Sequence, residues 1–447
     1  MLRARAMIGR FLGPETLRQR VIVLLFGTAL GQALPMLASP LLTRLFDPHE
    51  FGVLGVFSAA CMSLIPLATM RYECVLLIAR SAEDVADTLV LTGLTVLAMS
   101  LLALCIVAAI PFESFFDLPG LSHVKFFLPV ALFCVAMYQL LVYEATRVGN
   151  FTPVARTKLL QGVVGPSSQI LLGLAGFGPV GLVIGFILSQ AAGAASLYRR
   201  FIVPHFPAIR ASNLGRVRRL ARTHVSFPLF SSWSGVLQEA GNNYLIIILI
   251  IAFYDPTVAG FLFLSDRIVG RPLLIVTTSL LQVAAGDLSK RLREEPGTVL
   301  VRFLKIVGVQ FVLSTLWCGF VATVIPLIVA PVFGADWIGA VPFIQTICIA
   351  YVFQATMHPV SPTLQLMERQ GALAAWEIVR AAAIVGGVVW AARTGRDPLF
   401  AVALYAGIQA GMQILLFFGQ VYQISKLKAD PSQEAKSGAR ALEIATD

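Results

Sequence analysis

Twelve long apolar runs follow one another along this chain and constrain its fold more than any other feature. Each has about 20 residues or more, the length that an α-helix needs to cross the hydrocarbon core of a bilayer. An outer-membrane barrel would instead alternate polar and apolar residues along short strands. We therefore predict an all-α polytopic membrane protein. The twelve runs cover roughly residues 19–42, 50–70, 85–110, 125–146, 154–175, 179–201, 227–253, 256–282, 302–331, 339–364, 371–392 and 398–425.

The overall composition excludes a soluble protein. Of the 447 residues, 57% are hydrophobic and only 13% are charged, which no ordinary globular domain matches. The net charge of +10 is therefore not a nucleic-acid signal, and we expect no nucleic-acid partner.

Lysine and arginine predict the orientation, because loops on the cytoplasmic side of a membrane carry an excess of both. With the N-terminus inside, most of these residues fall in inside segments. The outside segments hold only Arg44, Lys125, Arg393 and Arg396. An even number of spans then places both termini in the cytoplasm.

A basic polar segment divides the spans into six and six. We predict a first six-helix lobe over residues 1–201, a cytoplasmic linker over 202–226, a second lobe over 227–425 and a cytoplasmic tail over 426–447. The linker and its edge are rich in arginine, which is typical of a tether that lies on anionic lipid. A dedicated partner site is the alternative.

The two halves repeat a short motif. Phe46-Asp47-Pro48 followed by Gly52 recurs as Tyr254-Asp255-Pro256 followed by Gly260, at a constant offset of 208 residues. Asp-Pro starts turns, and a glycine lets a helix begin close against a neighbour. Six spans return the chain to the same side, so the repeat predicts two parallel lobes related by an axis along the membrane normal.

Charged and amide side chains interrupt the two central runs, 227–253 and 256–282. An ionisable group at mid-bilayer costs at least about 2.5–3.5 kcal/mol, so such groups turn toward partners or a wet cavity. Residues three or four apart also share one helical face. The groups are Glu239, Asn242 and Asn243 in the first run, and Asp266, Arg267 and Arg271 in the second.

No pattern for cofactors or metals stands out. The six cysteines form no C-x-x-C pair, and nearly all fall inside apolar runs, which is typical of buried small apolar residues. The chain also lacks a phosphate-binding loop of the G-x-x-x-x-G-K-[S/T] type, so it does not use ATP itself. We expect no cofactor, no metal and no enzymatic activity.

Several motifs occur in order along the six-plus-six plan. They are Asp47-Pro48 with Gly52; Arg71-Tyr72-Glu73; Ala82-Glu83-Asp84; Gln238-Glu239 with Asn242; and Val258-Ala259-Gly260 through Arg267, Pro272, Leu280 and Gln282. With these residues, nearly the whole chain resembles the polysaccharide-transport branch of the multidrug/oligosaccharidyl-lipid/polysaccharide (MOP) exporter superfamily, the group of O-antigen and capsule-repeat flippases.

The resemblance implies two six-helix bundles that form a V in a bacterial inner membrane. It also implies translocation of undecaprenyl-diphosphate-linked oligosaccharide from the inner to the outer leaflet by alternating access, for O-antigen, capsule or exopolysaccharide synthesis. Membrane lipid is an expected partner, and a polysaccharide polymerase and glycosyltransferases are further candidates.

The implied substrate directs attention to arginine, which binds diphosphate through a charged, bidentate fork. The candidates are Arg44, Arg71, Arg147, Arg267 and Arg271, and the last two are preferred for their depth. Asn242 and Asn243 are candidate sugar ligands. Glu239 and Asp266 are candidates for binding a coupling cation or proton. The structural alternative is that Glu239 or Asp266 pairs with the deep arginines and merely holds helices together.

Other functions stay open. A membrane polysaccharide polymerase or glycosyltransferase would usually carry a large outer loop with acidic catalytic residues, and the outer loops here are short. A cation-coupled small-molecule antiporter of the same superfamily or of the major facilitator type would carry fewer deep arginines and more acids. A flippase for another lipid-linked sugar is the third alternative.

Overall fold

The computed structural model describes residues 17–79, 81–109, 121–239, 241, 244–361, 363–367 and 370–427. Every regular element in these ranges is helical, so the predicted all-α class is confirmed. Among the described residues, eight helices are long and apolar enough to cross a membrane, and each coincides with a predicted run. They are Pro48–Ala68, Ala82–Ala109, Lys125–Val148, Gly178–Phe201, Val299–Phe333, Ala340–Val360, Gly371–Arg393 and Pro398–Lys426.

The other four predicted runs are helical too. Helices α2 (Leu17–Leu45) and α7 (Thr152–Leu174) occupy the first and the fifth run. The two central runs are broken by π-helical turns. The first contains the π-helical turn η5 (Phe227–Ser231), α11 (Ser232–Glu239) and α12 (Leu245–Phe253); the second contains α13 (Pro256–Ser265), the π-helical turn η7 (Asp266–Gly270) and α14 (Arg271–Glu294).

The chain forms two compact units. Unit 1 comprises Met1–Leu264 and Val332–Trp337, and unit 2 comprises Ser265–Pro331 and Ile338–Asp447. The predicted lobe ranges, 1–201 and 227–425, stay a prediction.

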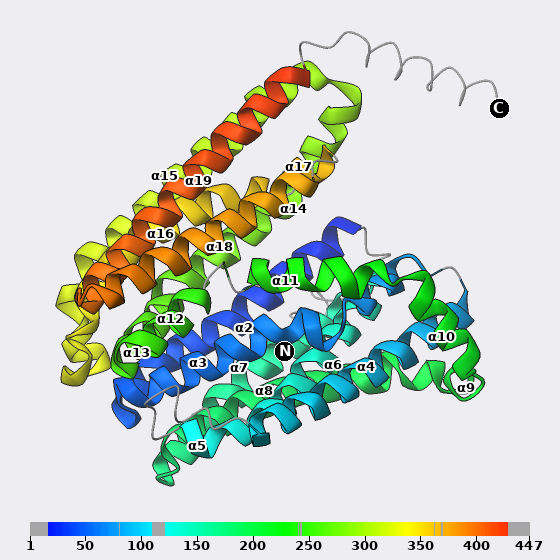
Figure 1. Cartoon of the computed structure of the whole chain (residues 1–447), viewed down its shortest axis with the longest axis horizontal. Helices are drawn as coiled ribbons and strands as arrows, with labels where there is room; N and C mark the ends of the chain where they lie inside the picture. The colour runs from blue at the N-terminus through cyan, green and yellow to red at the C-terminus, as the bar shows by residue number, and fades with distance from the viewer. Residues whose placement is uncertain are drawn as a thin grey trace, which may run out of the picture. The chain divides into compact units, whose positions relative to one another are not determined.

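Unit 1 is a bundle of long helices, drawn from blue to green in Figure 1. Helix α7 packs against α2 on one side and α8 on the other, and α6 packs against α3, α4 and α8. Its core joins buried side chains of α4, α6 and α8, among them Leu89, Leu141 and Leu197. The further elements are α3 (Pro48–Ala68), η1 (Tyr72–Leu77), α4 (Ala82–Ala109), α5 (Leu121–Val124), η3 (Lys125–Phe127), α6 (Leu128–Val148), α8 (Gly178–Phe201), η4 (Val203–His205), α9 (Phe206–Arg210), α10 (Leu214–Thr223) and η10 (Ala335–Trp337).

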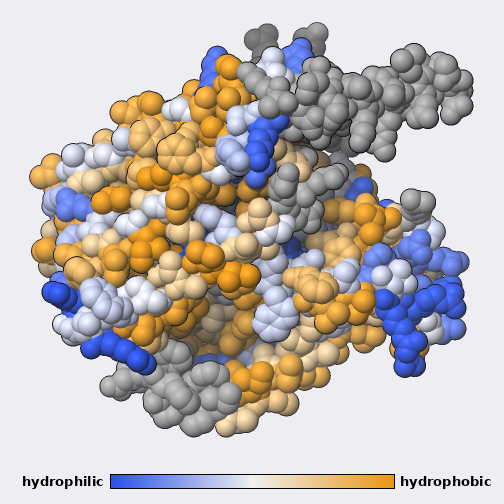
Figure 2. Space-filling model, turned by 45° about the horizontal axis from the view of Figure 1, so that its top comes forward, coloured by the Kyte–Doolittle hydropathy of each residue, from blue (hydrophilic) through white to orange (hydrophobic). Residues whose placement is uncertain are grey.

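The basic linker is helical, belongs to unit 1 and lies against α4. Asn213 caps the start of α10, and its side-chain oxygen accepts a hydrogen bond from the backbone of Gly215 at 2.8 Å. Arg216 of α10 forms ion pairs with Glu83 (2.9 Å) and Asp87 (3.1 Å) of α4. Figure 2 shows hydrophilic residues gathered over α9 and α10, whereas hydrophobic residues cover much of the remaining visible face.

The repeated glycines bring two helix starts into backbone contact within unit 1. A Cβ at Gly52 would lie 2.1 Å from the carbonyl oxygen of Pro256, and a Cβ at Gly260 would lie 1.8 Å from that of Pro48. The contact is reciprocal, as expected for equivalent positions of a repeat. Asp47 also caps α3 in a capping box with Glu50, through backbone-to-side-chain hydrogen bonds of 2.8 and 3.0 Å. The predicted role of these glycines in close helix packing is confirmed.

An aromatic cluster fills the space beside this contact. The fully buried Trp337 packs edge-on against Phe51, with ring centroids 4.9 Å apart, and against Phe261 at 6.1 Å. Its indole nitrogen donates to the carbonyl oxygen of Thr43 at 2.9 Å. The cluster therefore holds the ends of α2, α3 and α13 together through both packing and a satisfied buried donor.

Unit 2 is built on α15 and α16 with α19 (Figure 1). Phe303, Leu288 and Ile424 lie in its core, which α14, α15 and α19 share. Large apolar side chains such as Leu327 and Leu415 point outward, as helices that face lipid require. Its further elements are η8 (Pro296–Thr298), α15 (Val299–Ile328), the π-helical turn η9 (Val329–Phe333, whose last two residues belong to unit 1), α16 (Ala340–Met357), η11 (His358–Val360), α17 (Thr363–Leu366), α18 (Gln370–Arg393) and α19 (Pro398–Leu427).

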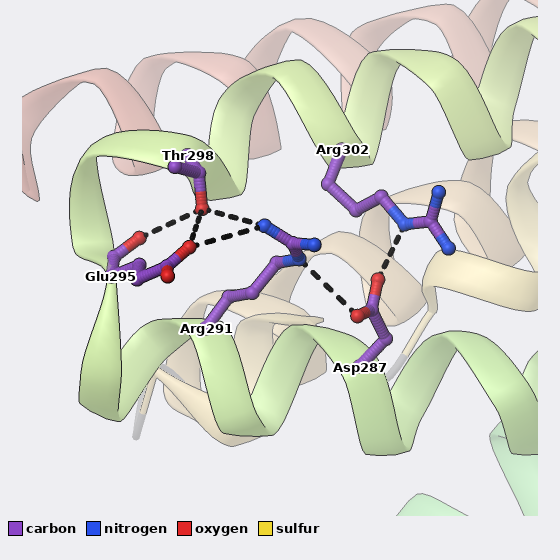
Figure 3. A network of polar contacts seen from close by, with 5 residues as sticks. All are labelled: Asp287, Arg291, Glu295, Thr298 and Arg302. Carbon is purple, nitrogen blue, oxygen red and sulfur yellow. Dashed lines mark hydrogen bonds and ion pairs between the residues drawn. The ribbon is translucent and has the colours of Figure 1, made fainter.

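A polar network joins α14 to α15 where the two helices meet (Figure 3). Asp287 accepts hydrogen bonds from Arg291 at 3.2 Å and from Arg302. Partial burial raises the pKa of Asp287, but the hydrogen bonds and charges of Arg302 and Arg291 outweigh it, and the net pKa is lowered.

Substitution of Gly52 by alanine should destabilise the protein. The added Cβ forces two backbones apart, and overpacking of this kind costs about 1–3 kcal/mol. Gly93→Ala is the matched control, because a Cβ there meets no atom within 4 Å and a helical alanine is favoured over glycine by about 0.5–1 kcal/mol. Thermal unfolding in detergent should show a lower Tm for Gly52→Ala and an equal or higher Tm for Gly93→Ala. A Tm for Gly52→Ala at the wild-type value would contradict the contact.

The Asp287 network should stabilise the protein at neutral pH and lose this effect in acid. A lowered folded pKa means that the contribution is present above the unfolded pKa of about 3.9 and disappears as the pH falls through the folded value. Asp287→Asn should therefore cost about 1 kcal/mol at pH 7, the scale of exposed ion pairs. The Tm gap between wild type and variant should close on acidification, and a gap that stays constant with pH would argue against the ion pairs.

Candidate functional site

Three of the deep charges predicted from the sequence lie at a π-helical turn in unit 2: Asp266 and Arg267 within the turn, and Arg271 directly after it. In this turn the backbone N–H of Arg271 bonds to the carbonyl of Asp266, five residues earlier, which brings the two side chains into register. The Arg271 Nε donates to the Asp266 Oδ2 at 2.9 Å. The Asp266 side chain is 8% exposed and that of Arg271 is 37% exposed, so the acid is buried and the base reaches outward.

Neighbouring helices support this ion pair. Tyr351 of α16 donates its hydroxyl to the Asp266 Oδ1 at 3.2 Å. A Cβ at Gly270 would lie 2.5 Å from that oxygen and 3.0 Å from the Tyr351 ring, so glycine makes room for both groups. Trp317 of α15 donates to the Val269 carbonyl at 3.3 Å. The half-buried Arg267 adds a second positive charge that acts on Arg271 and Asp266.

The polar region continues into α18 and α19. The buried Tyr405 lies where the charges of both Arg380 and Asp266 act on it. Arg380 is 1% exposed, forms an ion pair with Glu377 and stacks over the Trp376 ring at 4.8 Å. The Nε of Arg380 is buried without a hydrogen-bond partner in the described part of the chain. Unit 2 therefore holds a chain of ionisable side chains from Asp266 to Glu377.

A second polar region lies in unit 1, where α3 ends. Met70 and Arg71 both have left-handed backbones, with φ of 50° and 57°. Such a conformation costs about 1–3 kcal/mol for each residue other than glycine, and it is found where surrounding structure enforces it, often at functional sites. The strain ends α3 sharply and turns the Arg71 side chain toward α11.

Arg71 meets acids from two elements. Its charge acts on Glu73 of η1 and on Glu239 of α11. A Cβ at Gly235 would lie 2.7 Å from the Arg71 Nη2, so the guanidinium lies directly against the glycine of α11. Glu73 is 1% exposed, and burial raises its pKa while the Arg71 charge opposes the shift. The arrangement places one guanidinium and two carboxyl groups between α3, η1 and α11.

The remaining predicted residues lie elsewhere. Arg147 is held within α6 by the buried Glu144, through contacts of 2.8 and 2.6 Å that occupy its fork, and His205 reaches the same carboxylate at 3.1 Å. Arg44 is exposed in the last turn of α2. Asn242 and Asn243 lie outside the described residues.

The sequence offered a charge pair between Glu239 or Asp266 and the deep arginines as an alternative, but it did not indicate every ionisable residue of these regions. In the structure, Arg71 is the base that acts on Glu239, and Arg271 pairs with Asp266. Glu377 and Arg380 were missed, although two charges three residues apart inside the run 371–392 meet the same criterion of costly mid-membrane ions. Tyr351 and Tyr405 carried no sequence signal, because an aromatic residue in an apolar run is ordinary.

Comparisons with known proteins agree with this architecture. The sequence pattern of a family described as polysaccharide biosynthesis protein matches residues 41–342, about two thirds of the chain. No curated protein matches the chain.

The solved structures that resemble it are transporters. An inward-facing multidrug resistance MATE transporter of the MOP superfamily is 17% identical, with a TM-score of 0.57 over 95% of this chain and 98% of that one. An outward-facing MATE transporter is 14% identical, with a TM-score of 0.58 over 92% and 97%. A MOP superfamily transporter from Pyrococcus furiosus Vc1, described as having a binding pocket of reversed polarity, is 15% identical, with a TM-score of 0.60 over 92% and 97%. The chain has the fold of this superfamily.

Asp266→Asn should destabilise the protein more than Arg271→Gln. Loss of the buried carboxylate leaves two neighbouring arginines without their counter-charge, a situation that costs about 3 kcal/mol or more when buried. Loss of Arg271 leaves Asp266 with its Tyr351 donor and the nearby Arg267, and should cost about 1–2 kcal/mol. Thermal unfolding of both single variants and the double variant measures the coupling. Additive effects in the double variant would contradict the pair.

Proposed function

Because this chain belongs to the polysaccharide biosynthesis protein family, we propose that it is a flippase that moves undecaprenyl-diphosphate-linked oligosaccharide across the bacterial inner membrane by alternating access. The product then enters O-antigen, capsule or exopolysaccharide synthesis. The family and the transporter fold support the transport of a polysaccharide precursor.

The observation that carries the proposal is the partly exposed side chain of Arg271, which directly follows the π-helical turn. Its Nε is held by Asp266, which orients the fork and leaves more than a third of the side chain exposed. A diphosphate needs a permanent positive charge with several donors, and arginine supplies both. Arg267 on the same turn adds a second charge, and Arg71 in unit 1 is a further candidate ligand.

Acids beside these arginines fit a coupling role. Asp266 and Glu239 each lie beside an arginine, so a proton or cation on either carboxylate changes the positive field that the arginine presents. In this proposal, neutralisation of Asp266 frees Arg271 for the diphosphate, and recovery of the ion pair releases it.

A second candidate function is cation-coupled antiport of a small molecule. The solved structures with the same fold include multidrug resistance transporters, and this favours it. The two functions differ in what accumulates when the protein fails: a lipid-linked intermediate for the flippase, and a toxic small molecule for the antiporter.

Complementation of a deletion strain tests the flippase. Arg271→Ala and Arg267→Ala should each lower surface polysaccharide by about tenfold or more at equal protein level, because each removes a charge-assisted contact to the diphosphate. The lipid-linked intermediate should accumulate at the same time. Arg271→Lys keeps the charge but not the fork, and should restore only part of the polymer.

Arg393→Ala is the matched control, since this exposed arginine ends α18 away from the π-helical turn. It should complement like wild type. Normal polysaccharide in the deletion strain, together with raised sensitivity to cationic toxic compounds, would contradict the flippase function and support the antiporter function. If both alanine variants complement fully, Arg267 and Arg271 do not bind the substrate and have a structural role only.

A further inference from the structure

A pocket of about 440 Å³ opens in unit 1 between the start of α7 and the end of α8, apart from the residues discussed above. Its lining contains both polar and apolar residues. The lining residues are Asn150, Thr152, Pro153, Arg156, Thr157, Leu160, Ser196 and Arg200.

Two arginines face this pocket without a counter-charge. Arg156 lies one turn into α7, and Arg200 lies in the last turn of α8. Neither guanidinium forms an ion pair or hydrogen bond within the described residues, and none of the described residues that line the pocket is acidic. Two positive charges that share a pocket repel each other, so a bound anion would lower the energy of the arrangement.

The backbone adds to the positive field. Helix α7 has 23 residues, and its N-cap residue, Phe151, offers no side-chain hydrogen bond to the first turn. The N–H groups of Thr152 and Val154 are therefore left without a side-chain cap, at the positive end of the helix dipole. Thr152 and Pro153 belong to the pocket wall, so this helix end borders the same space as the two guanidiniums.

The floor of the pocket is fixed by contacts between α7 and α8. Ser196 donates to the Gly193 carbonyl at 3.0 Å, and the Thr157 hydroxyl lies 2.5 Å from that of Ser196. These hydroxyls bind one another and hold the two helices together, so the guanidiniums and the Asn150 amide remain as donors. Leu160, which is 40% exposed, continues the wall along α7 as an apolar surface.

We propose that this pocket binds the phosphate headgroup of an anionic membrane lipid. Two unpaired guanidiniums and a helix N-terminus match the charge and the acceptors of a phosphate. The pocket lies at the end of α8, which is long and apolar enough to cross a membrane, and Leu160 adds an apolar group to its lining. This inference does not rest on the proposed flippase function.

Lipid binding to the purified full-length protein tests the site. Native mass spectrometry in detergent would compare phosphatidylglycerol with zwitterionic phosphatidylcholine and with inorganic phosphate alone. Arg156→Gln and Arg200→Gln should each weaken phosphatidylglycerol binding by roughly tenfold, the effect of one lost charge-assisted contact, and the double variant should weaken it further.

Arg199→Gln is the matched control, because Arg199 neighbours Arg200 in sequence and is exposed, yet does not line the pocket. It should bind phosphatidylglycerol within twofold of wild type, about the accuracy of the comparison. The double variant Arg156→Lys/Arg200→Lys keeps both charges and checks that the fold is intact.

Three results would overturn the proposal. Equal losses for Arg199→Gln and Arg200→Gln would indicate a diffuse basic surface instead of a pocket. If the double glutamine variant binds phosphatidylglycerol as tightly as wild type, the pocket is not the binding site. Inorganic phosphate that binds as tightly as phosphatidylglycerol and displaces it would assign the pocket to free phosphate. None of these results depends on whether the protein transports an oligosaccharide.

Discussion

An ionised side chain inside a membrane is costly unless a partner compensates it, and this constraint organises the functional parts of the structure. In unit 2, Asp266 is matched by Arg271 and by the hydroxyl of Tyr351. Arg380 is matched by Glu377 and the Trp376 ring. Each group that would be unfavourable alone is held by partners that also fix its direction. A substrate or a proton can break such an ion pair only if it supplies a comparable interaction free energy. This requirement suits a transporter.

The repeated Asp-Pro-Gly motif fixes two helix starts within unit 1. Reciprocal contacts of Gly52 and Gly260 seat the start of α13 against the start of α3 within unit 1. Ten residues later α13 ends, and the π-helical turn with Asp266 begins. Backbone contact at equivalent positions of the two halves thus ties the start of α3 to the start of α13 within unit 1.

Much of the fold and part of the site follow from sequence. Apolar run lengths predicted where the helices lie, and the repeated motif predicted close packing at two glycines. The positions of Asp266, Arg267 and Arg271 in the middle of an apolar run also singled them out as site candidates. Pairing was harder to predict, because a regular α-helix brings residues three or four apart together, whereas the π-helical turn pairs Asp266 with Arg271 at a separation of five. The contact of Arg71 with α11 depends on a left-handed turn at Met70 and Arg71, two residue types that favour no such conformation. Tyr351 approaches Asp266 across 85 residues, a distance at which composition carries no information.

Translocation in a purified system tests the flippase proposal most directly. The protein would be reconstituted into liposomes that carry lipid-linked oligosaccharide with a labelled sugar in one leaflet, and loss of the label's accessibility to an impermeant reagent would be followed over time. We predict that wild-type protein moves the label across the membrane, whereas Arg271→Ala protein, reconstituted at the same density, behaves like protein-free liposomes. Wild-type liposomes that move the label no faster than protein-free ones, yet exchange a cationic dye for protons, would contradict the account.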